Sequence, residues 1–125
     1  MILIVDDVPG VTLAFGRVLN HVGVPYESAD SLATGRAAVE RDGWTGFILD
    51  IFLPDGTGVD LLEFIRQQPQ YHRTPAAIIT ADILLEDSLV ARIEAGCASL
   101  NCGVFNRAAI ETICLGLLLA RSETR

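Results

Sequence analysis

The sequence predicts an α/β fold, a doubly wound sheet in which five parallel strands alternate with five helices. Two observations indicate this fold. Short apolar runs of strand length recur along the chain, and segments whose apolar residues repeat with helical spacing separate them. Strands that are continuously apolar and lie between helices belong to a parallel sheet with both faces covered. The right-handed rule for crossover connections then leaves the doubly wound sheet as the leading topology.

The first strand and helix follow from the first 23 residues. Residues 1–5 form an apolar run that stops at Asp6-Asp7, which predicts a buried strand. After a Pro-Gly break, apolar residues recur every three or four positions through residues 11–22. This spacing is typical of an amphipathic helix, and Gly23 closes it.

The next three elements lead to the centre of the sheet. Residues 24–28 predict a short second strand. Asp30 or Ser31 can cap an alanine-rich second helix, which extends to about Arg41. The apolar run 46–50 follows and predicts the third strand.

The second half of the chain repeats the alternation. Two helices are marked by apolar residues at helical spacing: Val59, Leu62 and Ile65 in one, and Leu85, Leu89 and Ile93 in the other. The first must end by Pro69, and Gly96 closes the second. Residues 76–80 and 98–102 predict the fourth and fifth strands, and residues 106–121 predict the last helix.

Composition excludes several classes of protein. A chain of 125 residues has the size of one domain, and we expect a single domain over residues 1–125. Half of the residues are hydrophobic, which excludes a disordered chain. The net charge is −7, and all nine basic residues are arginines. Nucleic acid is therefore not expected as a direct partner, because phosphate binding requires basic clusters.

The sequence also indicates a cytoplasmic protein. No apolar run is long enough to span a membrane, and Asp6-Asp7 interrupts the apolar N-terminus too early for a signal peptide. Cys97, Cys102 and Cys114 are odd in number and have no zinc-site spacing. They fit a reducing compartment, and we interpret them as packing residues.

Asp50 is the first candidate functional residue. It ends the third strand, since Pro54 and the Asp55-Gly56 turn allow the strand to run no further. Ligands of open α/β sheets bind at the carboxyl ends of the strands. A carboxylate on such an apolar strand is costly unless a positive charge compensates it.

Polar side chains also follow two other strands. Asp6 and Asp7 end the first strand, and Thr80 ends the fourth. In a parallel sheet these ends lie along one edge, so the residues can converge with Asp50. Three carboxylates in one cleft would raise one another's pKa values, and a divalent cation such as Mg²⁺ would relieve this repulsion. Asp50 could then attack a phosphoryl group as a nucleophile, with Thr80 donating a hydrogen bond to a phosphoryl oxygen.

The chain resembles a response-regulator receiver domain, the phosphoacceptor module of two-component signalling, from Ile2 to about Leu119. The motifs that carry the resemblance are Asp6-Asp7, Asp50 with Leu53-Pro54-Asp55-Gly56, Thr80-Ala81 and Ala95-Gly96. The resemblance implies a flavodoxin-like sheet with strand order 2-1-3-4-5. It also implies a signalling phosphoacceptor rather than an enzyme, with at most slow self-phosphorylation and autodephosphorylation.

The resemblance further implies roles for the site residues. Asp50 would be phosphorylated by a sensor histidine kinase or a phosphotransfer protein. Asp7, Asp50 and the backbone carbonyl of Phe52 would bind Mg²⁺, and Asp6 would hold a metal-bound water. Thr80 would be the switch hydroxyl.

Two departures separate this chain from the family pattern. Receiver domains usually carry Lys-Pro after the fifth strand, where this chain has Gly103-Val104 followed by Phe105. The usual aromatic switch residue is replaced by Leu100. The lysine normally pairs with the phosphoryl oxygens and transmits the signal. The residues that would accept the phosphoryl group and bind the metal are therefore present, whereas the residues that would transmit the signal are altered.

Two functional hypotheses follow. The first is a phosphoacceptor that uses Asp50 and Mg²⁺ to control an output or partner. The second is a pseudo-receiver, a protein-interaction module that no longer signals by phosphorylation. The acidic residues and Thr80 favour the first, whereas the absent lysine favours the second. An independent hydrolytic enzyme is disfavoured, since no histidine or other base is expected in the cleft.

The last helix is apolar on all sides over residues 113–120, whereas a surface helix usually has one apolar stripe. Either its own domain covers the helix on more sides than usual, or it forms a dimer or partner interface. We expect the interface, centred on Leu115, Leu118 or their neighbours.

Overall fold

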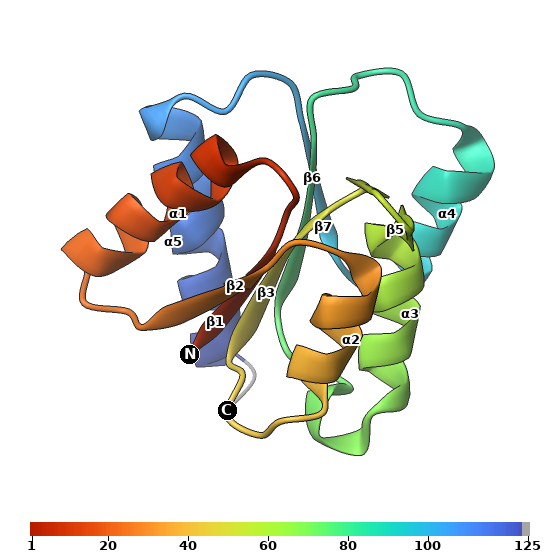
Figure 1. The fold of residues 1–125 in the computed structure, drawn as a ribbon, viewed down its shortest axis with the longest axis horizontal. Helices are drawn as coiled ribbons and strands as arrows, with labels where there is room; N and C mark the ends of the chain where they lie inside the picture. The colour runs from red at the N-terminus through yellow and green to blue at the C-terminus, as the bar shows by residue number, and fades with distance from the viewer. Residues whose placement is uncertain (124–125) are drawn as a thin grey trace.

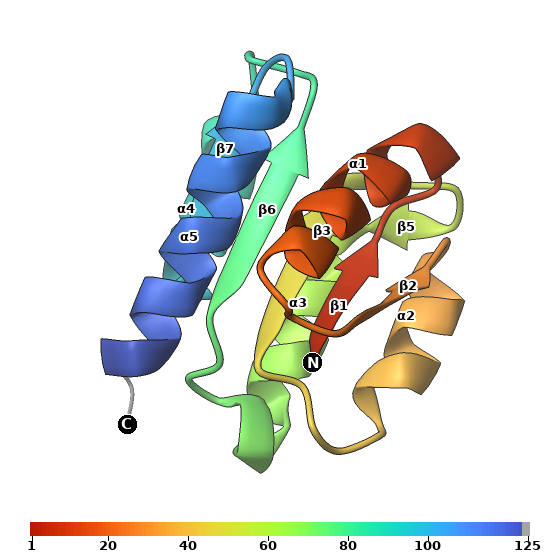
Figure 2. The same ribbon diagram turned by 90° about the vertical axis from the view of Figure 1, so that its left-hand side faces the viewer.

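The computed structural model, which describes residues 1–123, is a parallel sheet between two layers of helices (Figure 1). Helices α1 and α5 cover one face of the sheet, and α2, α3 and α4 cover the other (Figure 1). Figure 2 looks onto the face that α1 and α5 cover. The sheet strands are β1 (Ile2–Val5), β2 (Tyr26–Ala29), β3 (Gly46–Asp50), β6 (Ala76–Thr80) and β7 (Ser99–Cys102). The helices are α1 (Pro9–His21), α2 (Leu32–Val39), α3 (Gly58–Gln67), α4 (Asp87–Ala95) and α5 (Arg107–Glu123), with a short 3₁₀ helix at Pro69–Tyr71.

All neighbouring strands of this sheet are parallel, and their order is β2-β1-β3-β6-β7. The predicted pattern 2-1-3-4-5 therefore holds only when the five sheet strands are numbered by themselves. The difference arises from β4 (Phe52–Leu53) and β5 (Gly56–Thr57), which pair as a separate antiparallel hairpin. The sequence predicted only a turn here, because two-residue strands are too short to produce a periodic pattern.

Both faces of the sheet are buried, which explains why its central strands are continuously apolar. Alternate residues of a strand point to opposite faces. Leu3 and Val5 of β1 therefore pack in the core beneath α2, α3 and α4. Ile2 and Ile4 pack in the core beneath α1 and α5. Strand β2 is at the edge of the sheet and is only half buried.

Several helix ends differ from the prediction by a few residues. Helix α1 begins at Pro9, which the sequence analysis assigned to a break. Proline is favoured at the first helical position, since its missing N–H would have no intrahelical partner there. Ser31 caps α2 and forms a capping box with Thr34, so one of the two predicted caps is used. Helix α4 begins at Asp87, which leaves Leu85 in the preceding loop.

Helix α5 is buried on one side and exposed on the other. Ile110, Ile113 and Leu117 face the core, whereas Leu115 and Leu119 are each 57% exposed. The domain therefore does not cover the apolar helix on all sides.

The three cysteines differ in their burial. Cys114 is buried as predicted, but the interpretation of Cys97 and Cys102 as packing residues is wrong, because both are exposed. None of the helices within residues 1–123 is long and apolar enough to cross a membrane.

Candidate functional site

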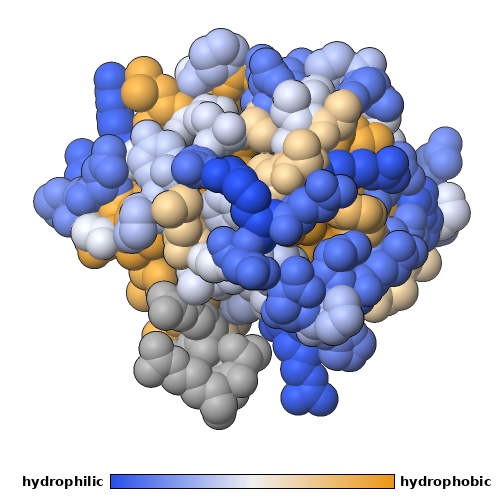
Figure 3. Space-filling model, turned by 60° about the horizontal axis from the view of Figure 1, so that its bottom comes forward, coloured by the Kyte–Doolittle hydropathy of each residue, from blue (hydrophilic) through white to orange (hydrophobic). Residues whose placement is uncertain are grey.

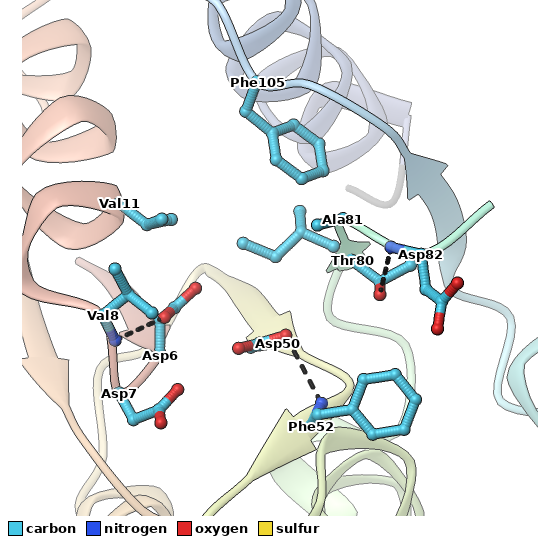
Figure 4. A pocket seen from close by; sticks show the side chains of 11 residues that line it. Asp6, Asp7, Val8, Val11, Asp50, Phe52, Thr80, Ala81, Asp82 and Phe105 are labelled. Atoms are coloured by element: carbon cyan, nitrogen blue, oxygen red, sulfur yellow. Dashed lines mark hydrogen bonds between the residues drawn. The ribbon is translucent and has the colours of Figure 1, made fainter.

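The candidate site is a cleft at the carboxyl ends of β1, β3 and β6 (Figure 4). It has a volume of about 510 Å³. Its lining comes from four segments of the chain: Asp6, Asp7, Val8 and Val11; Asp50 and Phe52; Ile79, Thr80, Ala81 and Asp82; and Phe105. The strand ends thus bring together all the candidate residues that the sequence indicated.

Three carboxylates lie close together in this cleft. One oxygen each from Asp6, Asp7 and Asp50 lies within 4.8 Å of the others. The Val8 N–H donates to Asp6 Oδ1 at 2.8 Å, and the Phe52 N–H donates to Asp50 Oδ1 at 3.4 Å. No arginine is among the described residues that line the cleft. Its carboxylates therefore face one another without a cationic side chain.

This arrangement raises the pKa values of two of the carboxyls. Burial is the largest cause for Asp50, and the charge of Asp6 is the next; together with Asp7 they raise the pKa of Asp50 to about 6. The Phe52 N–H opposes the shift. Burial also raises the pKa of Asp6, against the lowering effect of the Val8 N–H. Ionisation of all three carboxyls is thus unfavourable unless a cation is present.

The chain after Asp50 is held against the strand that it leaves. The Gly58 N–H donates to the Ile51 carbonyl at 2.8 Å. Thr57 caps α3 by accepting from the Asp60 N–H, and Asp60 accepts from the Thr57 N–H in return. These hydrogen bonds hold the first turn of α3 directly against the β4–β5 hairpin and the residue after Asp50. They therefore fix the position of the strand end that carries Asp50.

Asp55 is not part of the cleft. Its carboxylate accepts from the N–H groups of Leu32 and Ala33, at 2.7 and 3.0 Å, at the start of α2. These two hydrogen bonds lower the pKa of Asp55. The residue therefore joins the hairpin to a helix N-terminus, where a negative charge is stabilising.

Thr80 lines the cleft from the end of β6 and is only 2% exposed. Its hydroxyl oxygen accepts from the Asp82 N–H at 3.1 Å. Its carbonyl accepts from the Gly103 N–H at 2.9 Å, at the end of the neighbouring strand. Thr80 thus holds the start of the loop that leads to α4.

Gly103, where the family pattern leads us to expect a lysine, directly follows β7. Gly103 has a φ of +110°, and a Cβ atom there would meet no atom within 4 Å. Leu100 packs against the core on the side of α3 and α4. Arg107, the nearest arginine in the sequence, pairs with Glu111 at 2.9 Å and does not line the cleft. No described side chain therefore stands in for the missing lysine.

Apart from Ala81 of the Thr80-Ala81 motif, five lining residues were not predicted from the sequence: Val8, Val11, Ile79, Asp82 and Phe105. Val8 and Val11 flank the carboxylates, Asp82 follows Thr80 by two positions, and Phe105 stands over the opening in Figure 4. Phe105 is also paired with Phe15 of α1, with ring centroids 6.3 Å apart. Asp82 has a sequence signal, since it is an acidic residue two positions after a strand end; the apolar residues have none.

Comparison with known proteins agrees with this geometry. The family model described as response regulator receiver domain matches residues 2–99, and the match ends before Gly103. The response regulator protein PilR of Pseudomonas aeruginosa is 33% identical over 94 residues, which cover 75% of this chain and 20% of PilR. The chain spans about a fifth to a third of the length of the curated relatives it matches.

Two solved structures illustrate the similarity of fold. A CheY-like receiver domain protein from Methanospirillum hungatei has a TM-score of 0.81 at 24% identity, over 98% of this chain and 96% of that one. The receiver domain of the sensor histidine kinase PA1611 from Pseudomonas aeruginosa has a TM-score of 0.78 at 22% identity, over 94% and 95% of the two chains. The latter structure has a magnesium ion coordinated in its active-site cleft.

Proposed function

The chain belongs to the response regulator receiver domain family, and from this membership we propose that Asp50 accepts a phosphoryl group with the help of Mg²⁺. Receiver domains are signalling modules and not classical enzymes. The observation that carries the proposal is the convergence of Asp6, Asp7 and Asp50 in one cleft beside Thr80. In this proposal the whole of residues 1–125 is one receiver domain that works in the cytoplasm.

The donor set suits magnesium. Mg²⁺ prefers oxygen ligands and is usually bound through one or two carboxylates together with waters. Asp7, Asp50 and the Phe52 backbone carbonyl would bind the ion, and Asp6 would hold one of its waters. The raised pKa of Asp50 supports this assignment, since a cation would remove the repulsion that contributes to the shift.

The transfer itself is a displacement at phosphorus. A carboxylate oxygen of Asp50 attacks the phosphorus of a phosphohistidine on a sensor kinase or phosphotransfer protein. The new P–O bond forms as the P–N bond breaks, and the imidazole nitrogen keeps the electron pair of that bond and takes a proton. Mg²⁺, when bound, would offset the negative charge on the phosphoryl oxygens.

Thr80 would report the modification. In the unphosphorylated structure its hydroxyl oxygen accepts a hydrogen bond from the Asp82 N–H. Turning toward a phosphoryl oxygen would break this hydrogen bond and free the start of the loop between β6 and α4. Without a lysine, the phosphoryl group would have no cationic contact to the end of β7, so this loop would be the main route of readout.

A pseudo-receiver is the second candidate function, and the absence of a cation at Gly103 favours it. In that case the domain would bind partners without being phosphorylated. The two functions differ in a direct measurement. The protein is incubated with acetyl phosphate and Mg²⁺, and its intact mass is compared with that of Asp50→Asn. A phosphoryl adduct on the wild type alone supports the phosphoacceptor, and no adduct on either, with Mg²⁺ bound, leaves the pseudo-receiver.

A further inference from the structure

Half of the exposed large hydrophobic residues of the described chain lie at the end of the sheet that holds the acidic cleft. Five side chains, which we call the apolar collar, come from the four loops at the carboxyl end of the sheet: Val8, Phe52, Ile83, Leu84 and Val104. They are 50%, 53%, 72%, 85% and 89% exposed. Val8 and Phe52 line the cleft itself; Ile83 and Leu84 follow the lining residue Asp82 in the chain, and Val104 precedes the lining residue Phe105.

The collar is not an ordinary scatter of surface side chains. It includes the three most exposed large hydrophobic residues of the described chain, Ile83, Leu84 and Val104. The opposite end of the sheet, seen in Figure 3, is covered mostly by hydrophilic side chains with smaller apolar areas between them. Apolar groups gathered around a polar cleft are typical of surfaces that bind another molecule.

The charge at this end of the sheet restricts the partner. Asp6, Asp7 and Asp50 lie in the cleft that Val8 and Phe52 of the collar also line. The loop that carries Ile83 and Leu84 holds the acidic residues Asp82 and Glu86. Four arginines are engaged elsewhere: Arg41 with Glu27, Arg66 with backbone carbonyls, Arg92 with Asp60 and Glu63, and Arg107 with Glu111. An anionic surface would be repelled here, and so would the same acidic cleft of a second copy.

We propose that the apolar collar docks a partner protein that presents an arginine or lysine flanked by apolar side chains, with the cationic group entering the cleft beside Asp50. The apolar side chains would cover the collar. The cation would lie among the carboxylates of the cleft, whose described lining contains no positively charged side chain. Magnesium carries two positive charges against three carboxylates, so one further cation is accommodated even when the metal is bound.

The proposal rests on the proposed function only in using the same cleft, and its test requires no phosphorylation. The probe is a fluorescein-labelled synthetic helical peptide with one arginine flanked by leucines, in an alanine and glutamine background. Its binding is followed by fluorescence anisotropy in the presence of Mg²⁺. A matched peptide carries glutamine in place of the arginine, and a second carries serines in place of the leucines.

Two protein variants locate the binding surface. Ile83→Gln with Leu84→Gln removes part of the collar, and Leu115→Gln with Leu119→Gln removes exposed leucines from α5 as a control. Both pairs are exposed, so folding should be retained, and thermal unfolding checks this. We expect each altered peptide and the collar variant to bind about tenfold more weakly or worse, and the α5 variant to bind as the wild type does.

Four results would overturn the proposal. The first is no binding of the arginine peptide to the wild type. The second is equal binding of the arginine and glutamine peptides, which would remove the cationic requirement. The third is loss of binding in the α5 variant or retention in the collar variant, which would move the surface elsewhere. A collar that instead mediates self-association, lost in the collar variant during sedimentation, would also contradict it. Failure of phosphorylation alone would affect none of these measurements.

Discussion

A Cβ atom on Gly58 would lie 2.0 Å from the backbone oxygen of Asp50. This contact joins the first residue of α3 to the end of β3, and the opposing atom belongs to the backbone and cannot swing away. Glycine at position 58 therefore allows the hairpin between the two elements to close tightly. The position of the candidate phosphoacceptor depends on a residue that has no functional group.

Replacing Gly58 with alanine should destabilise the domain. The added methyl group forces β3 and α3 apart, and we expect a loss of about 2–4 kcal/mol in the free energy of unfolding. Gly116→Ala is the matched control, since a Cβ on Gly116 in α5 meets nothing within 4 Å. That change should stabilise the protein by about 0.5–1 kcal/mol through helix propensity. Urea unfolding measures both, and a neutral Gly58→Ala would show that the two elements can separate freely.

The raised pKa of Asp50 makes a second prediction. Its ordinary value is 3.8 and its value in the folded domain is about 6, so the folded state binds the proton more tightly than the unfolded state. The metal-free protein should therefore lose stability as the pH rises through the interval from about 4 to about 6. Asp50→Asn does not titrate and should be more stable above pH 6 by about 1–2 kcal/mol, allowing for solvent screening of a partly exposed group.

Two controls accompany this measurement. Adding Mg²⁺ should stabilise the wild type at neutral pH and have little effect on Asp50→Asn. Asp55→Asn should behave in the opposite sense, because hydrogen bonds lower the pKa of Asp55 in the folded state. Its loss of stability should be present at neutral pH and vanish as the pH falls through that lowered pKa. Identical pH profiles for wild type and Asp50→Asn would contradict the assignment of the shift to Asp50.

Gly103→Lys should accelerate phosphorylation of Asp50. Removing one charged donor from a site of this kind commonly costs on the order of 10²–10³ in rate, and the lysine would restore part of that factor. The backbone limits the gain, since the positive φ of Gly103 is strained for any residue with a side chain. Gly103→Ala carries the same strain without the charge and is the control. Rates are measured with acetyl phosphate and Mg²⁺, and equal rates for the lysine and alanine variants would exclude a charge effect.

The exposed side of α5 should mediate self-association. The sequence predicts an interface centred on Leu115, Leu118 or their neighbours; the structure exposes Leu115 and the neighbouring Leu119, while Leu118 is half buried. An uncovered leucine row on a helix favours association with another apolar surface. We expect wild-type protein to dimerise with rising concentration in sedimentation, and Leu115→Gln with Leu119→Gln to remain monomeric. A wild type that stays monomeric at high concentration would refute this interface.

The sequence by itself determined the alternation of strands and helices and the residues at the strand ends. Continuous apolar runs indicate strands buried on both faces, and helical spacing marks the segments between them. Because the carboxyl ends of parallel strands share one edge, Asp6, Asp50 and Thr80 could be grouped before their distances were known. The type of each element depends on residues that are near one another in the chain, so the pattern of apolar residues is enough to predict it.

Only the tertiary structure decided how the site is enclosed and what surrounds it. The β4–β5 hairpin, the Gly58 contact and the hold of Asp55 on α2 all join residues through close packing between different elements. The exposure of Leu84 and Val104 likewise depends on which loops meet at the carboxyl end of the sheet. The sequence does not distinguish a buried apolar loop residue from an exposed one, because burial depends on neighbours that are distant in the chain.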